Sequence, residues 1–120
     1  EDVTPIYKKN SWDRVKGDQL PVGLDLCLFD FGVNAGTGRA AKKLQAMIGT
    51  VVDGGIGPNT LAKLNDYLDV NDIEAVIHSY QQARQEYYES LSTFATFGRG
   101  WTRRNEETTT SAIEMARGEG

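Results

Sequence analysis

The chain has few of the residues that build disulfide frameworks or metal centres. Its 120 residues include one cysteine, Cys27, and one histidine, His78. This excludes an internal disulfide framework and a Cys/His zinc site, and we expect neither a metal ion nor a cofactor. The cysteine lies at helical spacing with three apolar residues, Leu24, Leu28 and Phe31. That spacing predicts a buried, inert thiol rather than a nucleophile.

The chain also lacks long apolar runs and a surplus of basic residues. No apolar run approaches the roughly 20 residues of a membrane span, and no basic start precedes an apolar stretch, so we expect no membrane span and no signal peptide in these residues. Acidic residues outnumber basic ones by 17 to 13, which gives a net charge of −4. Because proteins that bind nucleic acid usually carry a basic surplus, we expect no nucleic-acid partner.

Apolar residues recur with the period of an α-helix along most of the chain, which predicts an all-α fold of about six helices. The length suits a single domain. The longest expected helix has Ile73, Ile77, Tyr80, Tyr87 and Leu91 on its core side. The expected helices span residues 1–12, 21–35, 37–48, 58–68, 73–91 and 101–116.

Glycine and proline predict two breaks between these helices. Gly54, Gly55 and Gly57 can supply the positive φ angles of a compact loop, and Pro58 suits the first turn of the next helix, with Gly57 at its cap. The run Gly98-Arg99-Gly100 predicts a break before the last helix.

Several short sequence motifs occur in an order that resembles their order in a known family. They are IYKKNSWDRVKGDQLP, FDFGVNAGTGRAAKKLQ, VDGGIGPNT, YYESL and FGRGWTRR. Their order is similar to that of glycoside hydrolase family 108, the muramidase endolysins of phages and prophages with a predicted peptidoglycan-binding C-terminal part. The resemblance implies a lysozyme-like helical bundle in one domain, residues 1–120. In it, residues 1–50 would form the muramidase-like body and residues 51–116 the peptidoglycan-binding-like part.

The resemblance also implies a catalytic glutamate that this sequence does not contain. In the family it lies in a Glu-Gly-Gly-Tyr-like word upstream of the pair that matches Trp12-Asp13, and no such word occurs here. Either the chain is a fragment or it is a natural variant without the general acid; the first helix starts in mid-pattern, which favours a fragment. The catalytic residues therefore stay unknown. A missing first helix would expose apolar surface through which the chain could dimerise.

Asp30 is the acidic residue whose position raises a question of function. It lies between Phe29 and Phe31 in the most apolar helix, where an ionised carboxylate must be paired or must become protonated. We weigh two roles for it, a structural acid and a residue that lines a glycan cleft. Asn34, near the end of the same helix, either caps the helix or donates a hydrogen bond to a sugar amide.

Aromatic rings are the second set of candidates, because they can stack on sugar rings. The candidates are Trp12, Tyr87, Tyr88 and Trp101, although packing in the core or at helix junctions is the favoured interpretation of each. Of these, Trp12, Tyr88 and Trp101 are the expected substrate contacts. If Tyr87 faces the core, the adjacent Tyr88 points partly away from it. Three arginines near Trp101 either meet the stem-peptide carboxylates of peptidoglycan or are ordinary solvated side chains. They are Arg99, Arg103 and Arg104.

The sequence leaves two classes of function open. The first is a muramidase that cleaves the bond between N-acetylmuramic acid and N-acetylglucosamine and acts on peptidoglycan glycan strands. The second is a helical module that binds peptidoglycan, or a protein, without cutting it. For either class we expect synthesis in the cytoplasm and action in the bacterial periplasm or cell wall, after export or holin release.

Overall fold

The computed structural model describes residues 20–118, which fold into five α-helices with no strand among them. The expected all-α class is therefore confirmed. The expected helix over residues 1–12, with Trp12, lies outside the described residues. None of the described helices has both the length and the apolar character needed to cross a bilayer. The helices are α2 (Leu24–Ala35), α3 (Thr37–Ile48), α4 (Pro58–Val70), α5 (Ile73–Glu89) and α6 (Phe94–Ala116).

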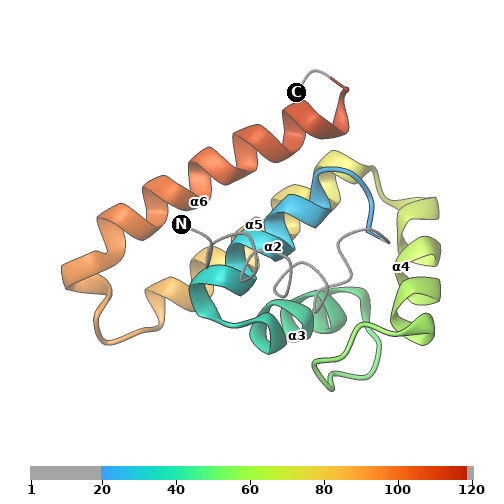
Figure 1. Ribbon diagram of the computed structural model, residues 1–120, viewed down its shortest axis with the longest axis horizontal. Coiled ribbons are helices and arrows are strands. Elements are labelled where there is room, and N and C mark those ends of the chain that lie inside the picture. The colour runs from blue at the N-terminus through green and yellow to red at the C-terminus, as the bar shows by residue number, and fades with distance from the viewer. Residues whose placement is uncertain (1–19, 119–120) are drawn as a thin grey trace, which may run out of the picture.

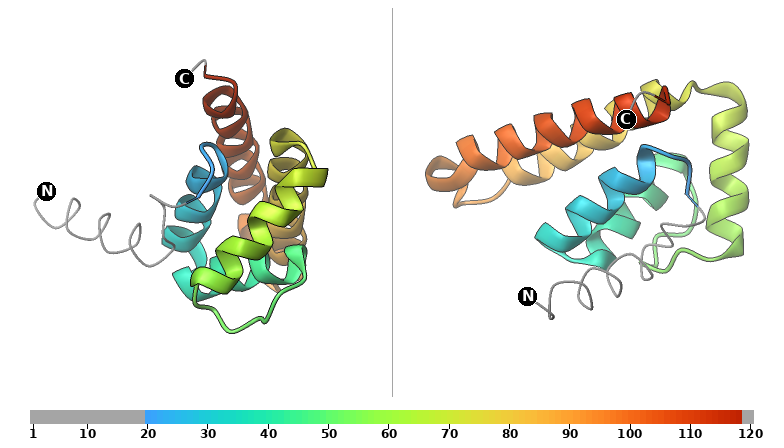
Figure 2. Two further views of the ribbon diagram at one scale, coloured as in Figure 1. Left: turned by 90° about the vertical axis from the view of Figure 1, so that its right-hand side faces the viewer. Right: turned by 45° about the horizontal axis from the view of Figure 1, so that its top comes forward.

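The two C-terminal helices, α5 and α6, lie side by side and form the most extensive helix pair (Figure 1). Helix α2 packs against both of them and against α3, while α4 stands crosswise at one end of the molecule (Figure 2). The predicted core face of α2 is confirmed, because four of its residues are fully buried. They are Leu24, Cys27, Leu28 and Phe31. Because α2 packs against α5 and α6, polar residues that flank its core face, such as Asp30, also lie close to these two helices.

One buried side chain, Gln45 of α3, organises the loop between α3 and α4. Its Nε2 atom donates to Asp53 Oδ1 at 2.9 Å, to the Gly55 carbonyl at 3.0 Å and to Thr60 Oγ1 at 3.1 Å. Its Oε1 atom accepts from the backbone N–H groups of Asp53 and Gly54 at 3.1 and 2.9 Å. This single amide thus supplies the partly buried loop backbone with hydrogen bonds that regular structure would otherwise supply.

The loop ends as the glycine–proline pattern predicts. Gly57 is the N-cap of α4 and Pro58 occupies its first turn. Of the three loop glycines expected to supply positive φ angles, only Gly54 does so, at 83°. Gly49, which follows α3 directly, has the left-handed conformation that ends the helix.

Four predicted helix boundaries differ from the structure. Helix α2 begins at Leu24 rather than at residue 21, and α4 ends at Val70 rather than at residue 68. Helix α5 ends at Glu89, two residues before Leu91. Helix α6 begins at Phe94 and runs through Gly98 and Gly100 without a break, so it is the longest helix at 23 residues. Gly98 is needed for close packing and not for a turn, because a Cβ atom at this position would lie 2.6 Å from the Phe94 ring.

We predict that Gln45→Leu destabilises the fold, because it leaves two backbone N–H groups and the Thr60 hydroxyl without their partner. The expected loss is about 2–3 kcal/mol of unfolding free energy, measured by urea denaturation. The matched control is Gln82→Leu, since Gln82 is an exposed glutamine of α5, and its effect should stay within about 0.5 kcal/mol. Equal losses in the two variants would contradict the role given to Gln45.

Candidate functional site

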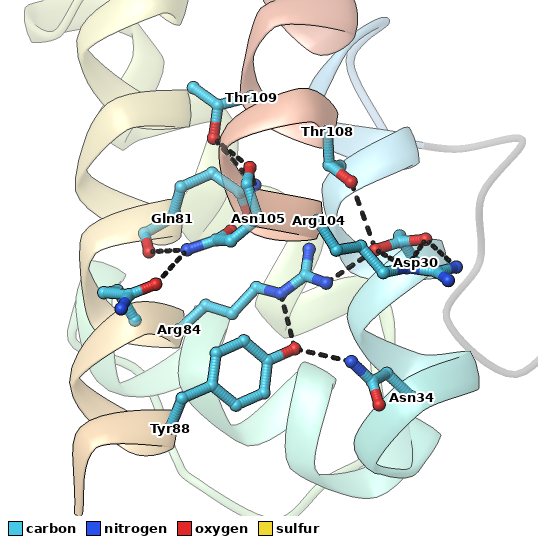
Figure 3. A network of polar contacts seen from close by, with 10 residues as sticks. Asp30, Asn34, Gln81, Arg84, Tyr88, Arg104, Asn105, Thr108 and Thr109 are labelled. Atoms are coloured by element: carbon cyan, nitrogen blue, oxygen red, sulfur yellow. Dashed lines mark hydrogen bonds and ion pairs between the residues drawn. The ribbon is translucent and has the colours of Figure 1, made fainter. Parts of the chain in front are cut away.

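A fully buried arginine, Arg84 of α5, lies at the centre of a polar cluster between α2, α5 and α6. Its Nε atom donates to Tyr88 Oη at 2.9 Å and its Nη2 atom donates to Asp30 Oδ2 at 2.6 Å. Figure 3 shows the side chain reaching from α5 toward Asp30 on α2. The guanidinium also lies over the Phe31 ring, 5.4 Å from its centroid. Hydrogen bonds, an ion pair and an aromatic face together compensate for the burial of this charge.

The Asp30 carboxylate is the point at which all three helices meet. Besides Arg84 it accepts from Arg104 of α6, with Nη2 at 2.7 Å from Oδ1, and from Thr108 Oγ1 at 3.2 Å. Its side chain is only 13% exposed, whereas that of Arg104 is 56% exposed. The carboxylate is thus paired within the fold, which agrees with the first role considered for Asp30, that of a structural acid.

These partners decide the ionisation state of Asp30. Burial alone would raise the pKa of this carboxyl, but the hydrogen bonds and charges of Arg104 and Arg84 outweigh burial and hold the pKa below its usual value of 3.8. A general acid for glycoside cleavage must carry a proton near the working pH. Asp30 is ionised there and cannot act as that proton donor.

The hydroxyl of Tyr88 extends the cluster to the end of α2. It accepts from Arg84 Nε and also from Asn34 Nδ2, at 2.8 Å. The expected capping role of Asn34 is wrong, because α2 ends on the backbone of Gly36 and the Asn34 amide binds Tyr88 instead. Two of the predicted substrate contacts are therefore bonded to each other.

The predicted directions of Tyr87 and Tyr88 are reversed in the structure. Tyr88 is 2% exposed and packs in the core, whereas Tyr87 is half-buried at the surface. Arg84 was not among the residues expected on the core side of this helix. Because Arg84 is buried, the core face of α5 instead includes Tyr80, Arg84 and Tyr88, spaced four residues apart.

A row of aromatic rings leads from this cluster to the surface. Trp101 of α6 packs on Tyr88 with ring centroids 5.4 Å apart, and Phe97 packs on Trp101 at 5.8 Å. Trp101 is half-buried and Phe97 is 54% exposed. The outer end of the row therefore presents an aromatic face to the solvent.

The structure brings together four of the five residues expected to bind substrate. Asp30, Asn34, Tyr88 and Trp101 belong to one connected cluster, and Trp12 lies outside the described residues. Arg84 holds them together and was missed. Its signal was available in the sequence, because an acid in an apolar helix needs a buried cation.

The three arginines expected near stem-peptide carboxylates have different environments. Arg104 is bound to Asp30, and Arg103 forms an exposed pair with Glu107 at 3.3 Å. Arg99 is exposed. Two of the three thus already have carboxylate partners within the chain.

The predicted burial of Cys27 is confirmed, because its side chain is fully buried. Burial raises the pKa of the Cys27 thiol to about 12, so the thiol stays protonated. Within residues 20–118 no group of three histidine, cysteine or acidic side chains could hold a metal ion.

The fold and the cluster define a helical domain in which a buried Asp–Arg pair ties three helices together below an aromatic surface. Residues 39–106 match the family described as "Predicted Peptidoglycan domain", and residues 1–36 match the family described as "Glycosyl hydrolase 108". The chain therefore belongs to the Predicted Peptidoglycan domain family, and the residues directly before that domain are similar to part of glycosyl hydrolase 108.

Among solved structures, the chain is similar to SagA from Brucella abortus. The two are 37% identical in sequence, with a TM-score of 0.88 over 97% of this chain. The chain spans 64% of the SagA chain. No curated protein matches it.

We predict that Asp30→Asn destabilises the protein by about 3 kcal/mol, at the lower end of the range for breaking a buried ion pair. The reason is that Arg84 would stay buried without its counter-charge. Urea denaturation measures the loss, and Asp69→Asn, at an exposed position of α4, is the matched control.

The same pair predicts a dependence of stability on pH. Because the pKa of Asp30 is lower in the folded state, its stabilisation is present above pH 3.8 and is lost as the pH falls below that value. The difference in unfolding free energy between wild type and Asp30→Asn should therefore shrink in acid. A difference that stays constant from neutral pH to about pH 2 would contradict the assignment.

Proposed function

We propose that this protein is a peptidoglycan hydrolase of the muramidase type, similar to an endolysin, that serves to degrade bacterial cell walls. Its reaction would be cleavage of the bond between N-acetylmuramic acid and N-acetylglucosamine, in the periplasm or cell wall. The observation that carries the proposal is the order of the two family matches, a glycosyl hydrolase 108 segment followed at once by a Predicted Peptidoglycan domain.

In this proposal the described helices hold the glycan strand rather than cleave it. The half-buried Trp101 and the exposed Phe97 supply a surface on which a sugar ring can stack, and Asn34 supplies an exposed amide on α2. The buried pair of Asp30 and Arg84 positions these groups by fixing α2 against α5 and α6. Asp30 itself contributes no proton to the reaction.

A second function has its own supporting observation. The ionised, doubly paired Asp30 removes the acid that the apolar helix would otherwise offer to catalysis. A module that binds peptidoglycan without cutting it fits that arrangement, and it is the alternative to the muramidase.

We predict that the 120-residue chain binds purified peptidoglycan but releases little or no soluble product, because these residues lack the Glu-Gly-Gly-Tyr-like motif that would supply the general acid of a muramidase. The measurement is co-sedimentation with sacculi, followed by mass spectrometry of the supernatant. Release of muropeptides with reducing N-acetylmuramic acid ends would contradict the weak activity expected and would favour the muramidase over the binding module. Absence of both pelleting and release would contradict both functions.

We predict that Phe97→Ala and Trp101→Leu each weaken binding to sacculi about three- to tenfold, which corresponds to about 0.7–1.4 kcal/mol. The reason is the loss of the aromatic surface at the outer end of the ring row. Val70→Ala, at an 82% exposed position of α4, is the control and should bind as wild type. Unchanged binding of both aromatic variants would show that the glycan lies elsewhere.

A further inference from the structure

A basic face of α3 borders a hollow beside the aromatic row. Arg39, Lys42 and Lys43 are spaced three and four residues apart and so share one side of the helix. The hollow has a volume of about 440 Å³. Its walls are these three side chains together with Gly38, Ala46 and Tyr87.

Aromatic contacts hold the basic groups in place. The Arg39 guanidinium carbon lies 4.7 Å from the centroid of the Tyr87 ring, and Lys43 Nζ lies 5.8 Å from it. Arg39 also donates from Nη1 to the Ala35 carbonyl at 3.0 Å. Cations held over one ring are positioned before any ligand arrives, which lowers the cost of ordering them.

The charges of this face are not neutralised by the described residues. No acidic residue borders the hollow, and no ion pair within residues 20–118 includes Arg39, Lys42 or Lys43. The chain as a whole carries a net charge of −4. Three neighbouring basic groups that have no acidic partner among residues 20–118, in a protein of net negative charge, favour an anionic ligand.

We propose that this face binds the carboxylates of the stem peptides of peptidoglycan, an inference that rests on the proposed function. Tyr87, which forms one wall of the hollow, packs against Tyr88 with ring centroids 5.8 Å apart. Tyr88 in turn packs against Trp101. A glycan strand over the outer aromatic rings would therefore extend its peptide substituents toward α3, where guanidinium and ammonium groups pair with carboxylates.

The test compares intact sacculi with glycan strands from which an amidase has removed the stem peptides. The first variant, Lys42→Gln/Lys43→Gln, removes two charges from the face and leaves Arg39 on its ring. The matched control, Arg99→Gln/Arg103→Gln, removes two exposed charges from α6. Circular dichroism verifies that both variants are folded.

We expect wild type to bind intact sacculi more tightly than stem-free glycan. The α3 variant should bind intact sacculi about five- to tenfold more weakly, and its binding to stem-free glycan should equal that of wild type. The difference between the two substrates should decrease at high salt, because exposed charges are screened.

Equal binding of wild type to both substrates would overturn the inference and leave the proposed function standing. An equal loss in the α6 variant would also overturn it, because the effect would then follow net charge rather than the α3 face. Absence of wild-type binding to either substrate would instead contradict the proposed function and the inference with it.

Discussion

The buried ion pair between Arg84 and Asp30 is the contact on which the arrangement of the helices depends. Removing a guanidinium from water costs several kcal/mol, so α5 can keep this charge in the core only where α2 supplies a carboxylate. Arg104 adds α6 to the same carboxylate from the other side. A three-way contact of this kind allows one relative position of α2, α5 and α6. The direction of Tyr88, and with it the bonding of Asn34, follows from that position.

The same contact distinguishes the residues that stabilise the fold from those that are exposed to a ligand. The two arginines that hold the helices together also keep Asp30 ionised, so of the two roles considered for Asp30 the structural one agrees with its contacts. Groups available to a ligand lie further out, on the aromatic row that ends at Phe97 and on the basic face of α3. The two surfaces meet at Tyr87 and Tyr88, adjacent residues on either side of the boundary between surface and core. A polymer with sugar rings and charged peptides could contact both surfaces at once.

Local patterns predicted most of the helices and part of the site. The apolar spacing of α2 and the Gly57-Pro58 start of α4 agree with the structure because each depends on residues close in sequence. The continuous α6 could not be predicted, because the need for glycine at position 98 arises from the Phe94 ring packed against it. Tyr87 and Tyr88 were exchanged because they lie seven and eight residues after Tyr80, and helical spacing allows either of them on the core face. Asp30, Asn34, Tyr88 and Trp101 were selected separately; their connection through Arg84 requires the tertiary structure.

The most direct test of this account is a titration of the Asp30 carboxyl carbon in the folded protein by ¹³C NMR. Because the carboxylate is paired with Arg84 and Arg104, we expect the pKa of Asp30 to lie below 3.8. A carboxyl that takes up its proton near neutral pH would contradict the account, because Asp30 would then be unpaired and suited to act as a general acid.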